Sequence, residues 1–163
     1  MAHPPIPDQD GEFTGMTATR ALGKSYKISI VNQNEVEAVW PFVIEHLERA
    51  VSFSNGEIET EDFLPLLLDE EMQLWAAVGD GECVAAMVTQ VIVYPRKKIM
   101  RVIAIGGRDM KIWMKNIDML ENFALAMGCT ELEAWTKRGF LRVLKDWKMS
   151  HIVIKKDLKG RLH

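Results

Sequence analysis

The sequence is poor in cysteine, has no strong bias of charge and lacks a long apolar run. Its two cysteines, Cys83 and Cys129, lie far apart and form no CxxC pair, which excludes a disulfide scaffold of the secreted kind. We expect both thiols to be reduced in a cytoplasmic protein. The net charge of −3 argues against a protein whose main task is to cover nucleic acid phosphates. No apolar run approaches the about 18 residues that cross a bilayer, so we expect no membrane partner.

Motifs that mark common enzyme chemistries are also absent. The sequence has no Gly-x-Ser-x-Gly elbow and no phosphate loop ending in Gly-Lys-Ser/Thr. The spacing of the histidines does not suit a metal site, and we expect none; they are His3, His46, His151 and His163. What is present is ordinary globular composition, with 48% hydrophobic and 26% charged residues in a chain of 163. This size and composition predict one compact domain.

Residues 1–24 differ from the rest of the chain, because prolines and glycines are interspersed with polar residues and no helical or strand period survives. We interpret them as an extended or flexible N-terminal arm. The alternative is an arm that orders only against a partner protein, with Ile6, Phe13 and Met16 as its anchors. A folded domain over residues 25–158 and a C-terminal tail over 159–163 complete the expected organisation.

Hydrophobic periodicity predicts strands and helices from Tyr26 onward. Alternation of apolar and polar residues indicates strands, and Asp80-Gly81 between two apolar runs is a hairpin turn signal. Apolar residues at helical spacing indicate helices; we expect Pro65 in the first turn of one and Asp109 at the N-cap of the longest. The expected strands cover 26–30, 74–78, 82–94, 98–105, 131–136 and 151–155, and the expected helices cover 36–51, 60–68, 109–127 and 140–147.

This order of elements predicts an α/β fold of the mixed α+β kind. A hairpin of long strands followed by β-α-β-α-β implies a central mixed sheet of about six strands with helices on both faces. The longest helix should connect two parallel strands. Its apolar face, which holds Trp113, Ile117, Leu120 and Phe123, should pack on the sheet.

The glycine pair Gly106-Gly107, followed by Arg108, should end a strand and lead into the longest helix. With this order of elements, residues 25–158 resemble the GNAT superfamily of acyl-CoA-dependent N-acetyltransferases. In that family, amides of the matching loop and of the helix N-terminus hold the CoA pyrophosphate. The resemblance therefore implies a CoA contact at Gly106, Gly107 and Arg108, although this loop is several residues shorter than the family motif.

The resemblance also bears on catalysis. Family members often use a glutamate near the third hairpin strand as a base, whereas residues 96–108 contain no acidic residue. Leu144 stands where the family's last helix often carries a tyrosine acid, and Tyr26 and Tyr94 lie outside that helix. We therefore expect a degenerate acyl-CoA site with no catalytic residue and no cofactor. Acetyl-CoA is expected only if the chain is a working enzyme.

A narrower resemblance lies toward the C-terminus. The stretches 137–144, Lys-Arg-Gly-Phe-Leu-Arg-Val-Leu, and 156–158, Lys-Asp-Leu, are similar to those of small GNAT-like proteins that tailed bacteriophages and prophages encode among their particle-building genes. This resemblance implies a non-catalytic structural or interaction component of a phage particle or its assembly. Its partners would be other particle proteins, and it would reside in the cytoplasm of a bacterial host or in the virion. The alternative is an acyl-CoA-dependent N-acetyltransferase.

A basic cluster of Lys137, Arg138 and Arg142 lies near Trp135 and Trp147 in the sequence. The plain interpretation is a solvated helix face whose tryptophans belong to the core. The alternative is a surface that binds an acidic partner or DNA. We therefore name the three basic residues as partner-binding candidates, while the acidic net charge makes nucleic acid the weaker candidate.

Overall fold

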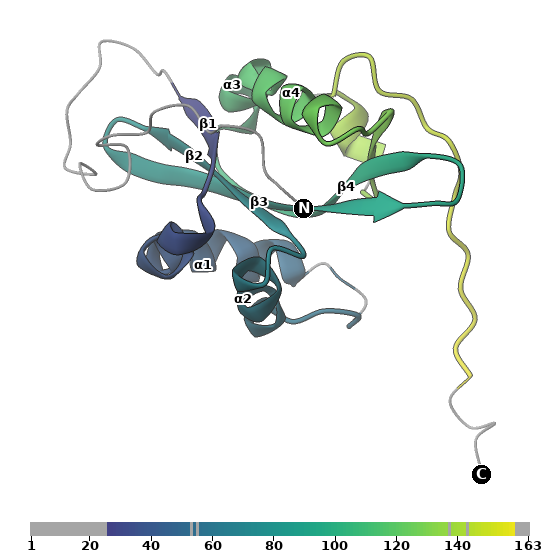
Figure 1. Cartoon of the computed structure of the whole chain (residues 1–163), viewed down its shortest axis with the longest axis horizontal. Coiled ribbons are helices and arrows are strands. Elements are labelled where there is room, and N and C mark those ends of the chain that lie inside the picture. The colour runs from purple at the N-terminus through teal and green to yellow at the C-terminus, as the bar shows by residue number, and fades with distance from the viewer. Residues whose placement is uncertain (1–25, 53, 55, 137, 143, 159–163) are drawn as a thin grey trace.

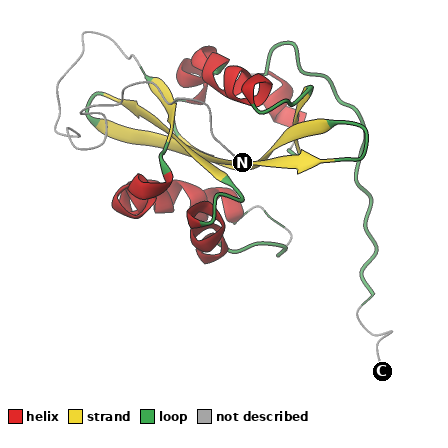
Figure 2. Ribbon diagram, in the orientation of Figure 1, coloured by secondary structure: helices red, strands yellow, loops and turns green. Residues whose placement is uncertain are grey.

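The computed structural model describes residues 26–52, 54, 56–136, 138–142 and 144–158, and shows a mixed sheet with helices on both faces (Figures 1 and 2). This arrangement confirms the predicted fold class. The elements are β1 (Lys27–Ile30), the 3-10 helix η1 (Gln33–Glu35), α1 (Val36–Val51), α2 (Thr60–Leu68), β2 (Gln73–Gly79), β3 (Glu82–Val93), β4 (Lys98–Gly107), α3 (Met110–Trp113), the 3-10 helix η2 (Met114–Asn116), α4 (Asp118–Ala126), β5 (Glu131–Ala134) and the 3-10 helix η3 (Arg138–Arg142).

The strands lie in the order β1-β2-β3-β4-β5. The first four are antiparallel to their neighbours, and β5 runs parallel to β4. The turn between β2 and β3 is Asp80-Gly81, where both residues have positive φ (53° and 76°), as a tight hairpin turn requires. The parallel pair needs a long crossover, which α3, η2 and α4 supply. Both features follow the sequence prediction.

Two hydrophobic cores lie on the two faces of the sheet. One face is covered by α1 and α2, and the other by α3 and α4 (Figure 1). Val43, Leu47 and Phe63 are fully buried on the first face. On the second face, the ring of Phe123 meets that of Trp75 edge to face, with centroids 5.4 Å apart. Each such buried side chain stabilises the fold by about 1.5–3 kcal/mol, so the two layers hold the sheet between them.

The predicted long helix over 109–127 is interrupted in the structure. It consists of the single turn α3, the 3-10 turn η2 and then α4. Asp109, the expected N-cap, has a left-handed backbone (φ 57°) and no capping hydrogen bond. Its carboxylate accepts a hydrogen bond from Tyr26 instead. Asp109 thus lies at the predicted N-cap position, but its side chain accepts a hydrogen bond from Tyr26 and does not cap the helix.

Pro65 was expected in the first turn of α2, and this is wrong, since it is the sixth residue of the helix. The start of α2 is held by other groups: the backbone N–H of Glu59 donates to the Asp62 carboxylate at 2.8 Å, in the manner of a capping box. Pro41 likewise lies inside α1.

The C-terminal part of the domain also departs from expectation. The predicted helix over 140–147 is the short 3-10 helix η3, which ends at Arg142. The predicted strand over 151–155 does not pair with any described strand, so the sheet has five strands where about six were expected. Residues 148–158 run away from the body as an extended, exposed segment (Figure 1). Alternation alone predicts an extended backbone but cannot supply a neighbouring strand.

Candidate functional site

The sheet opens between β4 and β5. The register pairs Ile99–Val102 with Glu131–Ala134, whereas β4 continues to Gly107. On its other side, β4 pairs Val102 with Thr89 and Ala104 with Val88, so Ile103 is an extra residue, which is a β-bulge. A bulge bends its strand and increases the local twist. Beyond Val102, no described strand pairs with the β5 side of β4.

On the side away from β3, the stretch Ile103–Gly107 of β4 has no neighbouring strand among the described residues, so it forms an edge with backbone hydrogen-bonding groups. Successive backbone groups of a strand point alternately to its two sides, so part of this stretch faces the opening rather than β3. Ala104 is buried against the core under α1, and Ile105 packs against the core under α4. The opening therefore lies between the two helical layers, with backbone amides along one wall.

The two glycines predicted to contact CoA are the last two residues of β4, so they end this strand as predicted. A Cβ on Gly106 would lie 2.2 Å from the His46 carbonyl oxygen of α1, and one on Gly107 would lie 2.4 Å from the Cα of Ala85 in β3. Gly107 also has φ 142°, which residues with a side chain rarely adopt. The close approach of α1 and β3 thus explains both glycines without a ligand. Their role in cofactor binding stays a prediction.

Arg108, the third predicted CoA contact, follows β4 directly. Its backbone N–H donates to the Val84 carbonyl at 2.9 Å, and its guanidinium lies 2.5 Å from the Glu82 carboxylate. Both groups of this ion pair are about half exposed, with 51% and 59% of each side chain accessible, so solvent screens the pair and it adds little stability. Its hydrogen bond to Glu82 raises the pKa of Arg108.

Tyr26 and Asp109 meet at the start of α3, a contact that sequence analysis missed. The Tyr26 hydroxyl donates to the Asp109 carboxylate at 2.7 Å, and Tyr26 is buried. The hydrogen bond to Asp109 raises the pKa of Tyr26 to about 12, with further contributions from burial and from the charges of Asp109 and Asp80. The two residues are 83 positions apart, and no local pattern marks such a pair.

This turn suits a diphosphate poorly. A helix N-terminus attracts anions through its backbone amides, but α3 is a single turn and Asp109 places a carboxylate at its start. Asp80 adds negative charge near Tyr26, and Glu82 is paired with Arg108. A carboxylate at the start of a helix weakens the attraction of that end for a phosphate group.

Side chains beside the β4–β5 opening are engaged with one another. The Arg101 guanidinium lies 2.6 Å from the Glu133 carboxylate and 4.4 Å from the centroid of the Trp135 ring. The Trp135 indole N–H donates to the same carboxylate at 2.9 Å, and Arg101 donates to the Tyr94 hydroxyl at 3.2 Å. Leu144, at the position implied for a tyrosine acid, is a buried core residue. This cluster orders the rim of the opening but presents no uncommitted proton carrier.

Of the partner-binding candidates, the described structure contains two, both in η3. Arg142 is exposed on η3, and the backbone of Arg138 belongs to the same short helix. Ile6, Phe13, Met16 and Lys137 lie outside the described residues. Their roles remain predictions.

The two cysteines are free thiols, as the sequence predicts. Burial raises the pKa of the Cys83 thiol to about 11, and burial also raises the pKa of Cys129. Neither is therefore an activated nucleophile at neutral pH.

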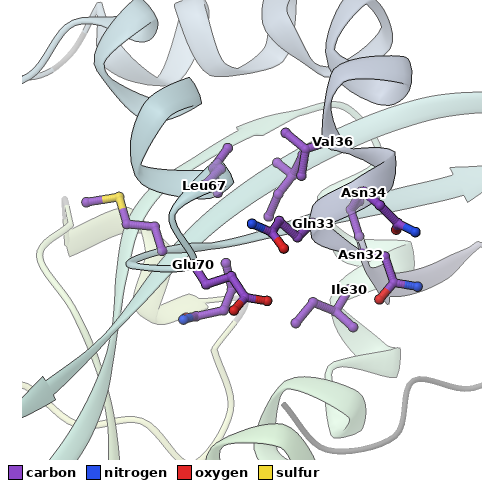
Figure 3. Close-up of a pocket in the computed structure, with 11 residues that line it drawn as sticks. Ile30, Asn32, Gln33, Asn34, Val36, Leu67 and Glu70 are labelled. Carbon is purple, nitrogen blue, oxygen red and sulfur yellow. The ribbon is translucent and has the colours of Figure 1, made fainter. Parts of the chain in front are cut away.

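A separate cavity of about 310 Å³ lies at the β1 edge of the sheet. Figure 3 shows the polar side chains of Asn32, Gln33 and Glu70 and the apolar ones of Val36 and Leu67 around it. The amide of Gln33 donates to the Leu68 carbonyl. Strands β2 and β3 separate β1 from β4, which borders the β4–β5 opening, so the cavity is not part of the opening.

Comparisons with known proteins support the fold. No family model and no curated protein matches the chain. Solved acetyltransferase structures do match over most of its length. An aminoglycoside acetyltransferase from an uncultured soil metagenomic sample, in complex with sisomicin, is 16% identical, with a TM-score of 0.58 over 81% of this chain and 97% of that one.

Two further structures agree. A predicted acetyltransferase with acetyl-CoA from Clostridium acetobutylicum is 13% identical, with a TM-score of 0.62 over 85% of this chain and all of that one (100%). A GNAT family acetyltransferase from Staphylococcus aureus subsp. aureus is 11% identical, with a TM-score of 0.57 over 82% and 99%. The chain therefore has the GNAT fold that its sequence resembles. None of these matches points to a phage particle.

Among the described residues, no helix combines the length and the apolar character that crossing a membrane requires.

Proposed function

We propose that the chain is an acyl-CoA-dependent N-acyltransferase that holds its donor mainly by the pantetheine arm. The observation that carries this proposal is the unpaired edge of β4 from Ile103 to Gly107, which the bulge opens beside the last β4–β5 pair. An extended ligand that carries amide groups can add to such an edge as another strand would. The fold is that of acetyltransferases, one of which was solved with acetyl-CoA.

In this proposal the residues of the chain bind and orient rather than transfer protons. The backbone of Ile103–Gly107 binds the arm, and the two helical layers exclude water from both sides of it. The thioester supplies an activated acyl group for a primary amine. The carboxylates of Glu131 and Glu133 are paired with Lys97 and Arg101. In this proposal water therefore accepts the proton of the amine. We expect slow turnover, because a positioned base typically contributes about 10²–10⁴-fold.

In this proposal the nucleotide end of the donor adds little to the binding affinity. The carboxylates of Asp80, Glu82 and Asp109 lie near the turn where its diphosphate would lie. Binding by the arm alone should be weak. We expect a dissociation constant of about 100 μM, well above the about 10 μM that would indicate a working phosphate cradle.

Calorimetric titration with acetyl-CoA and with S-acetyl-pantetheine tests the proposal. We expect the two ligands to bind within about threefold of each other, since they share the arm and differ by the phosphates. Release of free CoA thiol in the presence of a polyamine or a peptide amine then measures transfer. Affinity for acetyl-CoA about 100-fold above that of the shorter ligand would refute the arm-based mode.

Two variants that introduce the same side chain test whether the opening binds the donor. Ala134 ends β5 opposite Val102, and Ala134→Trp adds bulk beside the opening. Leu125 lies on α4 with 70% of its surface exposed, and Leu125→Trp adds the same side chain far from it. We expect the first variant alone to weaken donor binding, by about tenfold or more.

A second candidate is a non-catalytic GNAT-fold module that works through protein partners, as in a phage particle or its assembly. The Tyr26–Asp109 contact favours it, because this contact occupies the turn that a donor's phosphates would otherwise use. If neither ligand shows saturable binding at about 1 mM, the non-catalytic module is favoured over the acyltransferase. Mass spectrometry of purified phage particles would then test whether the chain is present in them.

A further inference from the structure

A chain of buried hydrogen bonds ends at the cavity of the β1 edge. The Trp75 indole N–H donates to the Thr89 hydroxyl at 2.9 Å, and this hydroxyl donates to the side-chain oxygen of Gln73 at 2.9 Å. The three residues are only 1%, 0% and 5% exposed. An indole N–H can only donate, so the hydroxyl accepts that bond and directs its own proton to Gln73. The Gln73 amide is therefore fixed, with its oxygen on Thr89 and its NH2 group on the other side.

The NH2 group of Gln73 has no hydrogen-bond partner among the described residues. Among those residues, the fully enclosed side-chain atoms without a partner belong to His46 and Asp80, so the NH2 group of Gln73 is accessible. Gln73 lines the cavity, and the cavity is where this buried side chain can meet another molecule. A buried donor without an acceptor is costly, so the cavity favours a molecule that brings an oxygen to this group.

Glu70 contributes the second polar group of the cavity (Figure 3). It follows Asp69, the C-cap of α2, and has a left-handed backbone with φ 59°. Glycine is the usual residue at such a position, because it has no Cβ. A glutamate there suggests that the side chain is used. A carboxylate has about four acceptor sites, so Glu70 can accept a hydrogen bond from a ligand besides its other contacts.

The remaining lining residues limit the chemistry of the ligand. None of the lining residues carries a positive charge, so the cavity does not suit an anion. None is aromatic, so a flat base has no ring on which to stack. The amides of Asn32 and Asn34 can both donate and accept, and Val36 and Leu67 can contact carbon atoms. Hydroxyl groups on a short carbon skeleton match this lining, because each hydroxyl also donates and accepts.

We propose that this cavity binds a small uncharged polyol, such as a monosaccharide. One of its oxygens accepts a hydrogen bond from the Gln73 NH2 group, and one of its hydroxyls donates to the Glu70 carboxylate. The volume of about 310 Å³ is at the lower end of ligand sites and suits one sugar ring rather than a nucleotide. Because β2 and β3 separate β1 from β4, this site is distinct from the β4–β5 opening.

Nuclear magnetic resonance titration of the full chain tests the proposal. Glucose, sorbitol and myo-inositol are each added to about 100 mM without any acyl donor, while the Gln73 NH2 and Trp75 indole N–H signals are followed. We expect at least one polyol to shift both signals saturably, with a dissociation constant of about 10 mM or below. Acetate and putrescine are the charged comparison ligands and should not shift them saturably.

Two variants and a matched control assign the binding to this cavity. Gln73→Glu keeps an oxygen for Thr89 and removes only the donor, and Glu70→Gly removes the carboxylate while suiting the left-handed backbone. Each should raise the dissociation constant by about tenfold or more. Asp146→Gly makes the same backbone change at φ 66°, away from the cavity, and should leave the affinity unchanged.

Three results overturn the proposal. They are no saturable shift with any of the polyols, tighter binding of acetate or putrescine, and polyol binding that Glu70→Gly leaves unchanged. If Gln73→Glu does not fold, the comparison of Glu70→Gly with Asp146→Gly decides the question. Because no acyl donor is present, these outcomes are independent of the proposed acyltransferase activity.

Discussion

Replacing Gly106 by alanine tests whether the glycine pair of β4 serves packing or ligand binding. The added Cβ would lie 2.2 Å from the His46 carbonyl oxygen and 3.2 Å from the Ala50 Cβ, both on α1. Carbon and oxygen in ordinary contact are about 3.3 Å apart or more, so α1 must move away from the sheet by about 1 Å. The contact involves backbone, which cannot rotate aside as a side chain can.

The size of the effect follows from what α1 covers. Val43 and Leu47 of α1 are fully buried against the sheet, and a gap of about 1 Å forfeits a quarter to a half of each dispersion contact along the interface. Overpacking of a tight core costs about 1–3 kcal/mol. Because the clash is with backbone, we expect Gly106→Ala to lower the free energy of unfolding by about 3 kcal/mol, at the upper end of that range.

Urea denaturation followed by circular dichroism measures this loss. Gly139→Ala is the matched control, since no atom lies within 4 Å of the added Cβ and the free energy of unfolding should stay within about 0.5 kcal/mol. A loss below about 1 kcal/mol for Gly106→Ala would refute the packing explanation. If the variant kept its stability but lost donor affinity, the glycine would belong to the binding site.

Three further predictions concern the core, the pH dependence and residues 1–24. Phe123→Ala should lower the free energy of unfolding by about 3–4 kcal/mol, because the ring is buried against Trp75; in urea denaturation, a loss below about 1 kcal/mol would contradict the assigned face. The pKa of Tyr26 is raised from 10.0 to about 12, so its stabilising effect is complete below pH 10 and is lost as the pH rises through 12. Melting temperatures across this range should fall less steeply for Tyr26→Phe than for the parent chain. Deleting residues 1–24 should leave the melting temperature within a few degrees, because described residues from Tyr26 onward already form two buried cores; hydrogen exchange on free and assembled protein tests whether this arm contacts a partner.

Local chemistry determined most of the secondary structure. Alternating residues placed β2, β3 and β4 close to their observed bounds, and Asp80-Gly81 set the hairpin because its two positive φ angles suit few residue pairs. The buried face of α1 followed from helical spacing. Such signals lie within a few residues of one another, so a sequence carries them without any knowledge of the fold. The order of these elements was sufficient to predict the GNAT fold.

The candidate site depended on contacts that no local pattern encodes. The glycines were predicted to end a strand, but the close approach of α1 and β3 that requires glycine there has no local signal. The bulge at Ile103, which opens the β4 edge, appears only in the register with β3. Asp109 was predicted to cap a helix and instead accepts a hydrogen bond from Tyr26, far away in the chain.

Residues 151–155 show the same division between local pattern and tertiary contact. Their alternation predicted an extended backbone, which the structure has, but a strand also needs a neighbour to accept its hydrogen bonds. Periodicity reports which side of an element is apolar, and it cannot say what will cover that side. Which segments meet is decided by the packing of the whole chain, because each such contact joins residues whose separation in sequence carries no signal of its own.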